Sequence, residues 1–258
     1  MSFERLTMLL EEIGSGRYGR PPASIVIVSG AALRLTQLGH NALTAKEARL
    51  AHDAYRLYYG QTEGPGNAIS NAGPTALLFE AVSFFLFGAS DTVARLVPAL
   101  LGIGMILLIF ASRRIIGESR ALGTAVLLAL SPSVVYISRL ATTEIYVAAF
   151  TLLTLVAILR IGLPELGDDR RLAWSFAAGA GLAAMFGSGP SALSVLIAAA
   201  AAAVVAALLD NREENAFRRS LRAFTTSARA PAAFVAGLVI GLVTLFSRFF
   251  TEFGALAG

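Results

Sequence analysis

The chain has 258 residues, of which 56% are hydrophobic and 15% are charged, and its formal net charge is +4. A mean hydropathy of +0.69 and several apolar runs of bilayer length exclude an ordinary soluble domain and indicate an all-α integral membrane protein. Long Ala, Leu and Val runs argue against a membrane β-barrel, and the lack of cysteine excludes disulfides and thiolate metal sites. The basic residues are spread between the apolar runs, so they indicate membrane topology rather than nucleic-acid binding.

The N-terminal residues 1–20 lack the pattern of a cleavable signal peptide and are predicted to form an amphipathic helix on the cytoplasmic surface, with Phe3, Leu6 and Leu9 at helical spacing. The first membrane span is predicted over 22–38. Arg34 lies near its outer end, so its side chain is expected to snorkel to the membrane surface.

The first outer loop, 39–92, contains two further helices. Residues 42–59 alternate apolar and charged side chains and predict an amphipathic helix that is too polar to cross lipid. The apolar run 75–87 is too short for a span and contains Glu80. If this run crossed the membrane, the arginine-rich loops would lie outside, which the N-terminal basic residues contradict. We therefore predict a re-entrant or interfacial helix on the outer side. Glu80 is then either an inward-facing polar group or, the favoured alternative, an interfacial one.

Arginine clusters after alternate apolar runs then predict seven spans in a transmembrane domain over 21–258, with the N-terminus in the cytoplasm. The expected location is a plasma membrane, such as a bacterial inner membrane. After the first, the spans are predicted over 93–111, 121–137, 145–159, 173–187, 191–209 and 231–246. The arginines that separate these spans on the cytoplasmic side are Arg113, Arg114, Arg120, Arg160, Arg170, Arg171, Arg212, Arg218, Arg219, Arg222 and Arg229.

Two acidic residues in the outer loops are candidates for a functional site. Glu47 begins the amphipathic helix of the first loop, and Glu144 follows the short second loop. We expect the two carboxylates to converge over one cavity at the membrane surface. Such a pair can bind a divalent cation, Mg²⁺ or Mn²⁺, or one of them can act as a general base.

Several short motifs in 31–160 share an order and spacing with one known family. These are Leu33-Arg34, Lys46-Glu47-Ala48-Arg49, Gly73-Pro74, Arg95-Leu96-Val97-Pro98, Leu130-Ser131-Pro132, Ser138-Arg139 and Glu144. In these features the chain resembles the membrane glycosyltransferases of the GT-C fold, which include the protein O-mannosyltransferases. The resemblance implies sugar transfer from a polyprenyl-phosphate donor at the outer face of the membrane.

The resemblance also implies roles for individual residues. Glu47 is the remaining candidate for the catalytic base, Glu144 is a candidate metal ligand, and Arg139 and Lys46 are candidates to bind the lipid phosphate. The family pattern has an Asp before the Glu of the first loop and takes that Asp as the base. Lys46 stands there instead, and Ala72 replaces a His that many relatives have before the Gly-Pro.

These departures leave a second hypothesis open. The chain would then be a catalytically silent, GT-C-derived structural or accessory subunit of a larger membrane complex, with small-residue faces at 177–184 and 198–207 packing on partner helices. Simpler roles also exist for the site residues. Glu47 can be a solvated residue that pairs with Arg49 or Lys46, Glu144 can pair with Arg139, and Arg139 can be an interfacial anchor.

Overall fold

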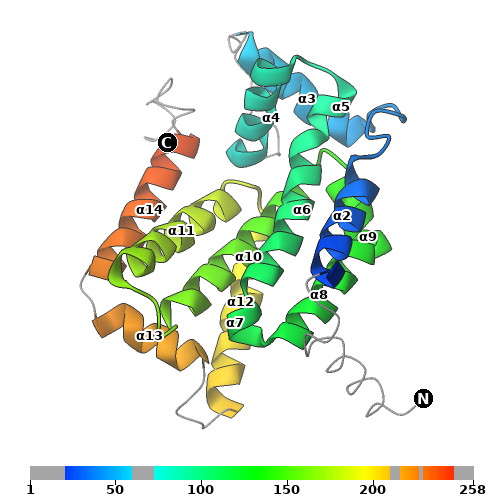
Figure 1. Cartoon of the computed structure of the whole chain (residues 1–258). Coiled ribbons are helices and arrows are strands. Elements are labelled where there is room, and N and C mark those ends of the chain that lie inside the picture. The colour runs from blue at the N-terminus through cyan, green and yellow to red at the C-terminus, as the bar shows by residue number, and fades with distance from the viewer. Residues whose placement is uncertain (1–20, 60–72, 210–215, 227–228, 247–258) are drawn as a thin grey trace.

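A computed structural model describes residues 21–59, 73–209, 216–226 and 229–246, and within these ranges the regular secondary structure is entirely helical (Figure 1). The predicted N-terminal helix and C-terminal segment lie outside the described residues. The helices are α2 (Pro21–Leu35), α3 (Ala45–Tyr58), α4 (Pro74–Phe87), α5 (Asp91–Ala94), α6 (Leu96–Ala111), α7 (Arg113–Ile116), α8 (Glu118–Leu130), α9 (Pro132–Ser138), α10 (Thr143–Ile161), α11 (Asp168–Phe186), α12 (Ser191–Leu209), α13 (Ala216–Thr226) and α14 (Arg229–Phe246).

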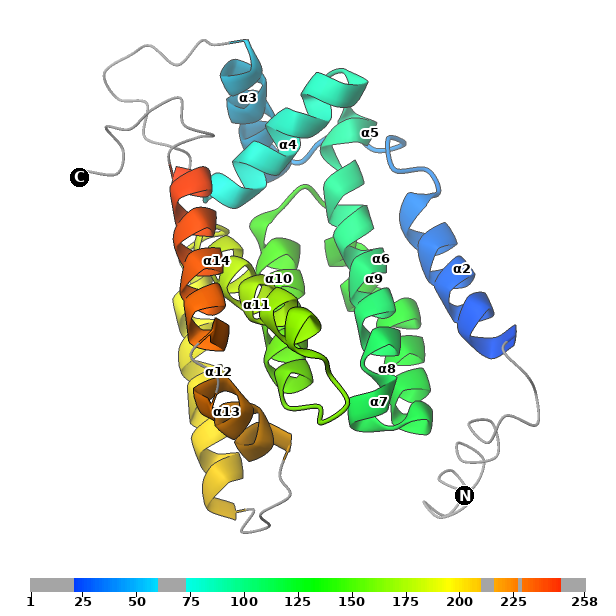
Figure 2. The ribbon, with the colours of Figure 1, turned by 60° about the vertical axis from the view of Figure 1, so that its left-hand side comes forward.

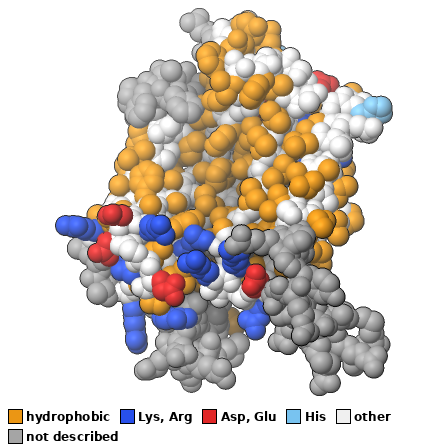
Figure 3. Space-filling model, viewed as in Figure 1, with side chains coloured by type: hydrophobic (Ala, Val, Ile, Leu, Met, Phe, Trp, Pro, Cys, Tyr) orange, Lys and Arg blue, Asp and Glu red, His pale blue; other side chains and the backbone are white. Residues whose placement is uncertain are grey.

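The long helices pack side by side as a bundle in which α6 and α10 are central. α6 packs against α2, α8 and α10, while α10 packs against α11, which in turn packs along α14. The space-filling view shows apolar side chains over most of the length of this bundle and charged side chains gathered at one end (Figure 3). The prediction of an all-helical membrane protein is therefore confirmed.

The two ends of the bundle are defined by hydrogen bonds between segments distant in sequence. At one end, called here the α3 end, the backbone N–H of Ala141 before α10 donates to Glu47 of α3, and Arg139 after α9 donates to carbonyls at the end of α2. At the opposite end, the α13 end, Ser220 of α13 donates to the carbonyl of Leu159 near the end of α10. Helix α10 thus runs from the α3 end to the α13 end.

Helix α4 lies obliquely across the α3 end and does not run along the bundle (Figure 2). At its start, the backbone N–H of Thr75 donates to the carbonyl of Gly187 after α11 at 2.9 Å, and the Thr75 hydroxyl donates to the carbonyl of Ala184 at 2.9 Å. At its other end, Gly88 turns the chain toward α5 and the start of α6. Both ends of α4 therefore lie at the same end of the bundle, as expected for a helix that does not span.

Three helices in the described residues are long and apolar enough to cross a membrane, namely Asp91–Ala111, Thr143–Ile161 and Arg229–Phe246. A fourth candidate is the pair α8 and α9, which is bent by 62°. The sequence predicted one continuous run over 121–137. The structure divides it at Ser131 because Pro132 cannot donate a backbone hydrogen bond to the preceding turn. The total of seven spans and the cytoplasmic N-terminus remain predictions.

The prediction that Arg34 snorkels to the surface is wrong, because the side chain is fully buried. Its guanidinium donates to the carbonyl of Leu128 at 2.8 Å and to that of Ala129 at 3.3 Å. Leu128 lies four residues before Pro132, so its carbonyl lacks the usual helical donor. Arg34 therefore caps the broken end of α8 and ties α2 to it.

The contact between α11 and α14 is made through glycine on both sides. A Cβ atom added to Gly179 would lie 2.0 Å from the carbonyl oxygen of Phe234, and one added to Gly237 would lie 2.2 Å from that of Phe176. The two backbones are thus in direct contact, which small residues permit. The small-residue face at 177–184, predicted for a partner helix, therefore packs at Gly179 against α14 of the same chain.

Candidate functional site at the α3 end

The candidate site is built around the first turn of α3. Thr44 is the N-cap of this helix, and its hydroxyl accepts a hydrogen bond from the backbone N–H of Glu47 at 3.4 Å. The Glu47 carboxylate reaches back and accepts from the backbone N–H of Thr44 at 2.8 Å. This reciprocal arrangement is a capping box, which satisfies two of the free N–H groups at the start of a helix.

Glu47 is also bound by Arg95, the residue immediately before α6. Arg95 Nε donates to Oε1 of Glu47 at 2.8 Å, and Nη2 donates to Oε2 at 3.0 Å. The same guanidinium donates to the carbonyls of Leu38, Asn41 and Ala42 in the segment before α3. A two-bond pairing of this kind fits the planar guanidinium to the carboxylate.

The second outer loop adds a further donor to Glu47. The backbone N–H of Ala141 donates to Oε1 at 3.0 Å, and the Thr44 hydroxyl donates to Oε2 at 2.9 Å. Burial would raise the pKa of Glu47, but the hydrogen bonds from Arg95, Thr44 and Ala141 lower it to about 2. The side chain is fully buried, so the simple prediction of a solvated Glu47 paired with Arg49 or Lys46 is wrong.

Lys46 and Glu144 form an exposed ion pair beside this buried cluster. Lys46 Nζ donates to Oε1 of Glu144, which is the second residue of α10. The side chains keep 63% and 49% of their surface exposed. The two loops are in contact here, and the partner of Glu144 is Lys46 rather than Arg139. A shared cavity over the Glu47 and Glu144 carboxylates remains a prediction.

Arg139 is directed toward the end of α2. Its Nη1 donates to the carbonyl of Leu33 at 2.9 Å, and its Nη2 donates to that of Thr36 at 2.8 Å. The guanidinium thus caps carbonyls at the C-terminus of a helix. Phosphate binding by Arg139 remains a prediction, and a phosphate would have to share this group with the backbone of α2.

Glu80 of α4 is buried at the same end, with 1% of its surface exposed, so it is the inward-facing polar group, and the favoured interfacial position is wrong. Neither carboxyl oxygen has a hydrogen-bond partner. Burial raises the pKa of Glu80 to about 8, and the negative charge of Glu47 adds to this rise. Glu80 is therefore a neutral acid at neutral pH.

The carboxylates of the site do not fit a divalent cation as they are arranged. Both oxygens of Glu47 are taken up by donors, and the ammonium group of Lys46 already supplies a positive charge to Glu144. Within the described residues there is no group of three or more His, Cys, Asp or Glu side chains that could hold a metal ion. Binding of Mg²⁺ or Mn²⁺ at Glu144 stays a prediction.

Arg95 is the site residue whose role sequence reasoning missed. It lies 48 residues from Glu47, and nothing local marks it as the partner. The capping box could have been found, because Thr44-Ala45-Lys46-Glu47 has the Ser/Thr-x-x-Glu pattern that indicates one. That pattern gives the Glu47 carboxylate a structural role in capping the helix, in addition to its place at the helix start.

Two solved structures of one protein are similar in fold to this chain. The solved structure of ArnT from Cupriavidus metallidurans in the apo state is similar, with 21% identity and a TM-score of 0.64 over 89% of this chain and 44% of that one. The same protein bound to undecaprenyl phosphate gives 19% identity and a TM-score of 0.62 over 97% and 43%. The chain therefore spans less than half the length of ArnT. The search of curated proteins gives no match.

The family model described as dolichyl-phosphate-mannose-protein mannosyltransferase matches residues 71–227. The matched range includes α4 to α13 and begins after Lys46 and Glu47. The likeness to ArnT extends over α2 and α3 as well and shows that the fold is of the GT-C type. The chain belongs to the dolichyl-phosphate-mannose-protein mannosyltransferase family of GT-C membrane glycosyltransferases.

Proposed function

We propose that the chain is a membrane module that binds a polyprenyl phosphate at its α3 end and has no working general base in the first outer loop. The observation that carries this proposal is the hydrogen bonding of Glu47. Its two oxygens accept from Thr44, Arg95 and Ala141, and the side chain is fully buried. The role that follows is that of a catalytically silent subunit in a larger membrane assembly.

Sugar transfer needs a group that removes the proton from the acceptor hydroxyl. An effective base lies within hydrogen-bond reach of that hydroxyl and has a pKa near the working pH. A Glu47 pKa of about 2 makes the carboxylate a very weak proton acceptor. The resemblance places the usual Asp base at position 46, where Lys46 carries the opposite charge.

Lipid binding remains chemically well supported at this end. The Lys46 ammonium is exposed, lies beside the start of α10 and is one of the two candidate phosphate-binding groups that the family resemblance implies. ArnT, which has the same fold, has been solved with undecaprenyl phosphate bound. In the present chain a phosphate would compete with the Glu144 carboxylate for the Lys46 ammonium.

Because of this competition, two variants should change the binding of undecaprenyl phosphate in opposite directions. Undecaprenyl phosphate is added to the purified protein in detergent, and its occupancy is followed by native mass spectrometry. Glu144→Gln frees the ammonium and should strengthen binding, whereas Lys46→Met should weaken it, each by several-fold. Arg56→Gln, farther along α3, is the matched control. Equal occupancy in all of these proteins would contradict the proposal.

The rival function is sugar transfer itself, which is favoured by the convergence of the two outer loops at Lys46 and Glu144. In that case Glu47 would be the base and Glu144 would bind a cation, while Arg139 and Lys46 would hold the phosphate. Release of mannose from radiolabelled polyprenyl-phosphate mannose distinguishes the two functions. We expect no release by the wild type. Release that is lost in folded Glu47→Gln protein would establish the rival.

The same assay on Lys46→Asp asks whether only the base is missing. Release by this variant, with none by the wild type, would mean that the rest of the site is still arranged for transfer.

The accessory role predicts in addition that partner proteins co-purify in fixed ratio in mild detergent. Wild-type transfer activity without any partner would contradict it.

A further inference from the structure

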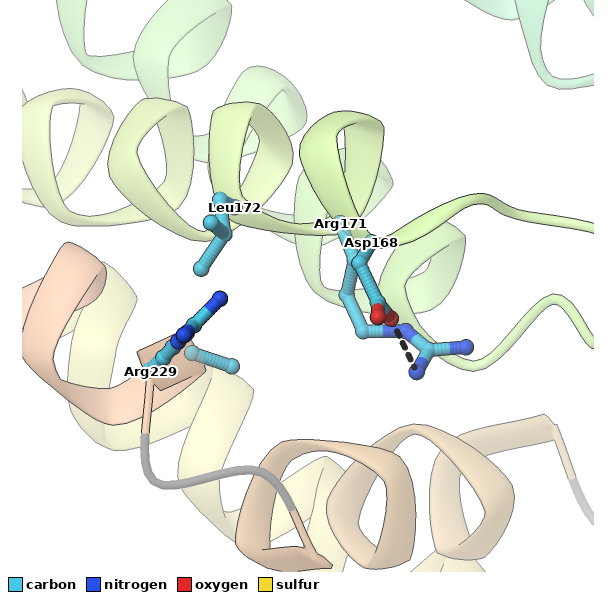
Figure 4. Close-up of a pocket in the computed structure, with 5 residues that line it drawn as sticks. Asp168, Arg171, Leu172 and Arg229 are labelled. Atoms are coloured by element: carbon cyan, nitrogen blue, oxygen red, sulfur yellow. Dashed lines mark ion pairs between the residues drawn. The ribbon is translucent and has the colours of Figure 1, made fainter.

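A small hollow lies at the α13 end of the bundle, far from the site described above. It is formed where α11 and α14 begin and is lined by Asp168, Arg171, Leu172, Arg229 and Ala230 (Figure 4). Its volume is about 30 Å³, which is more than one water-sized group needs. An oxygen atom of a larger group can therefore enter it.

The two arginines of the hollow have unused capacity to bind an anion. Arg171 Nε is buried and has no hydrogen-bond partner. Its Nη1 lies 3.6 Å from Asp168, which is 91% exposed, and its Nη2 donates to the carbonyl of Leu166 at 3.5 Å, so both contacts are weak. Arg229 is exposed, and Figure 4 shows its side chain directed between the two helices toward Leu172.

The hollow lies at the end of a helix of membrane-spanning length. Arg229 is the first residue of α14, which is long and apolar enough to cross the membrane. In Figure 3 the Lys and Arg side chains form a band at this end, beneath the apolar surface of the bundle. Positive charge at this end favours anionic lipids.

The lipid-facing side of α14 continues from Arg229 as an apolar track. Val235, Val239 and Ile240 are each about half exposed, and with the exposed Ala232 and Ala236 they form a stripe at i, i+3 and i+4 spacing that begins at Arg229. An acyl chain could lie along these side chains while its headgroup stays at Arg229. The surface therefore offers a contact to each part of a phospholipid.

We infer that the hollow between α11 and α14 binds the phosphate of an anionic phospholipid headgroup, with one phosphate oxygen entering beside Arg171 and Arg229. Guanidinium groups suit this ligand because they bind phosphate oxygens in two-bond geometry. Asp168 opposes binding by holding part of the charge of Arg171.

The test uses the full chain in detergent and titrates dioctanoyl phosphatidylglycerol by isothermal calorimetry. Arg229→Gln should weaken binding about tenfold, as expected for one charge-assisted hydrogen bond, and Asp168→Asn should strengthen it. The control is Arg120→Gln, which removes an exposed charge from α8 at the same end. An equal loss in Arg120→Gln would mean general attraction and would overturn the inference.

Two further ligands identify the source of the phosphate. Dioctanoyl phosphatidylcholine, which has the same phosphate without net charge, should bind more weakly than phosphatidylglycerol. Inorganic phosphate should displace the lipid only at far higher concentration, because it lacks the acyl chains that lie along α14. Equal binding of phosphatidylglycerol and phosphatidylcholine would overturn the inference, and so would displacement by inorganic phosphate at the concentration of the lipid.

Discussion

Glu47 and Arg95 form a buried ion pair that joins α3 to the start of α6. The two hydrogen bonds between them are 2.8 and 3.0 Å long, and the side chains keep 0% and 6% of their surface exposed. Because Ala141 donates to the same carboxylate, the pair also holds the loop that precedes α10. The α3 end of the bundle is therefore organised around one carboxylate.

Removing one partner of this pair should be costly, because the other is left buried without a counter-charge. We expect Arg95→Met to lower the free energy of unfolding by about 3–5 kcal/mol, measured by denaturant titration in mixed micelles. Lys46→Met breaks the exposed pair with Glu144 and should cost less than about 1 kcal/mol. Similar losses in the two variants would mean that the buried pair does not stabilise the fold.

Glu80 should make the protein less stable as the pH rises. Its pKa is about 8 in the folded chain against an ordinary value of 4.5, so between these values the folded state holds a proton that the unfolded state has lost. The free energy of unfolding then falls by up to about 1.4 kcal/mol per pH unit from this group. Glu80→Gln should remove this decline from thermal melts taken between pH 5 and 8. Parallel pH profiles for the two proteins would contradict the assignment.

The pKa of Glu47 is shifted the other way, and its contribution has the opposite sign. With a folded value of about 2 against 4.5, the stabilisation is present above about pH 4.5 and is lost as the pH falls toward 2. We expect acid unfolding of the wild type in this range, followed by loss of helical circular dichroism. Glu47→Gln should flatten that acid transition, and an unchanged transition would show that other carboxylates cause it.

The helical membrane fold and the meeting of the two outer loops could be predicted from the sequence because both depend on local pattern. The length of an apolar run and the position of arginines along the chain determine which segments cross and which end they reach. Helix α4 is likewise predicted not to span, because a run of thirteen residues that contains Glu80 is too short to cross.

The partners of buried charges could not be predicted, because they depend on packing between distant segments. Arg34 donates to a carbonyl 94 residues away, and that carbonyl is available only because Pro132 breaks the following helix. From the sequence alone, an arginine near the end of an apolar run is expected to reach water. Desolvation of Glu80 likewise depends on how α4 packs on the helices beneath it.

The capping of α8 by Arg34 can be tested with a double-mutant cycle. Arg34→Leu leaves the Leu128 and Ala129 carbonyls without a donor and should lower the free energy of unfolding by about 2–3 kcal/mol. Pro132→Ala restores a backbone N–H that can bond to Leu128, so it should reduce the cost of Arg34→Leu by about 1 kcal/mol. Additive losses in the double variant would show that Arg34 does not act through the break.

The backbone contact between α11 and α14 predicts that Gly179 tolerates no side chain. In Gly179→Ala the new methyl group would meet the carbonyl oxygen of Phe234 at 2.0 Å, and a carbonyl in a helix cannot move without its neighbours. The helices must separate, at a cost of about 1–3 kcal/mol or more. Gly104→Ala is the matched control, because no heavy atom lies within 4 Å of its added Cβ, and it should change stability by less than about 1 kcal/mol. The measurement is the midpoint of thermal unfolding in detergent. Because α14 begins at Arg229, a shift of α14 away from α11 in Gly179→Ala should also weaken phosphatidylglycerol binding at the hollow. Gly104→Ala should change neither the unfolding midpoint nor the lipid binding.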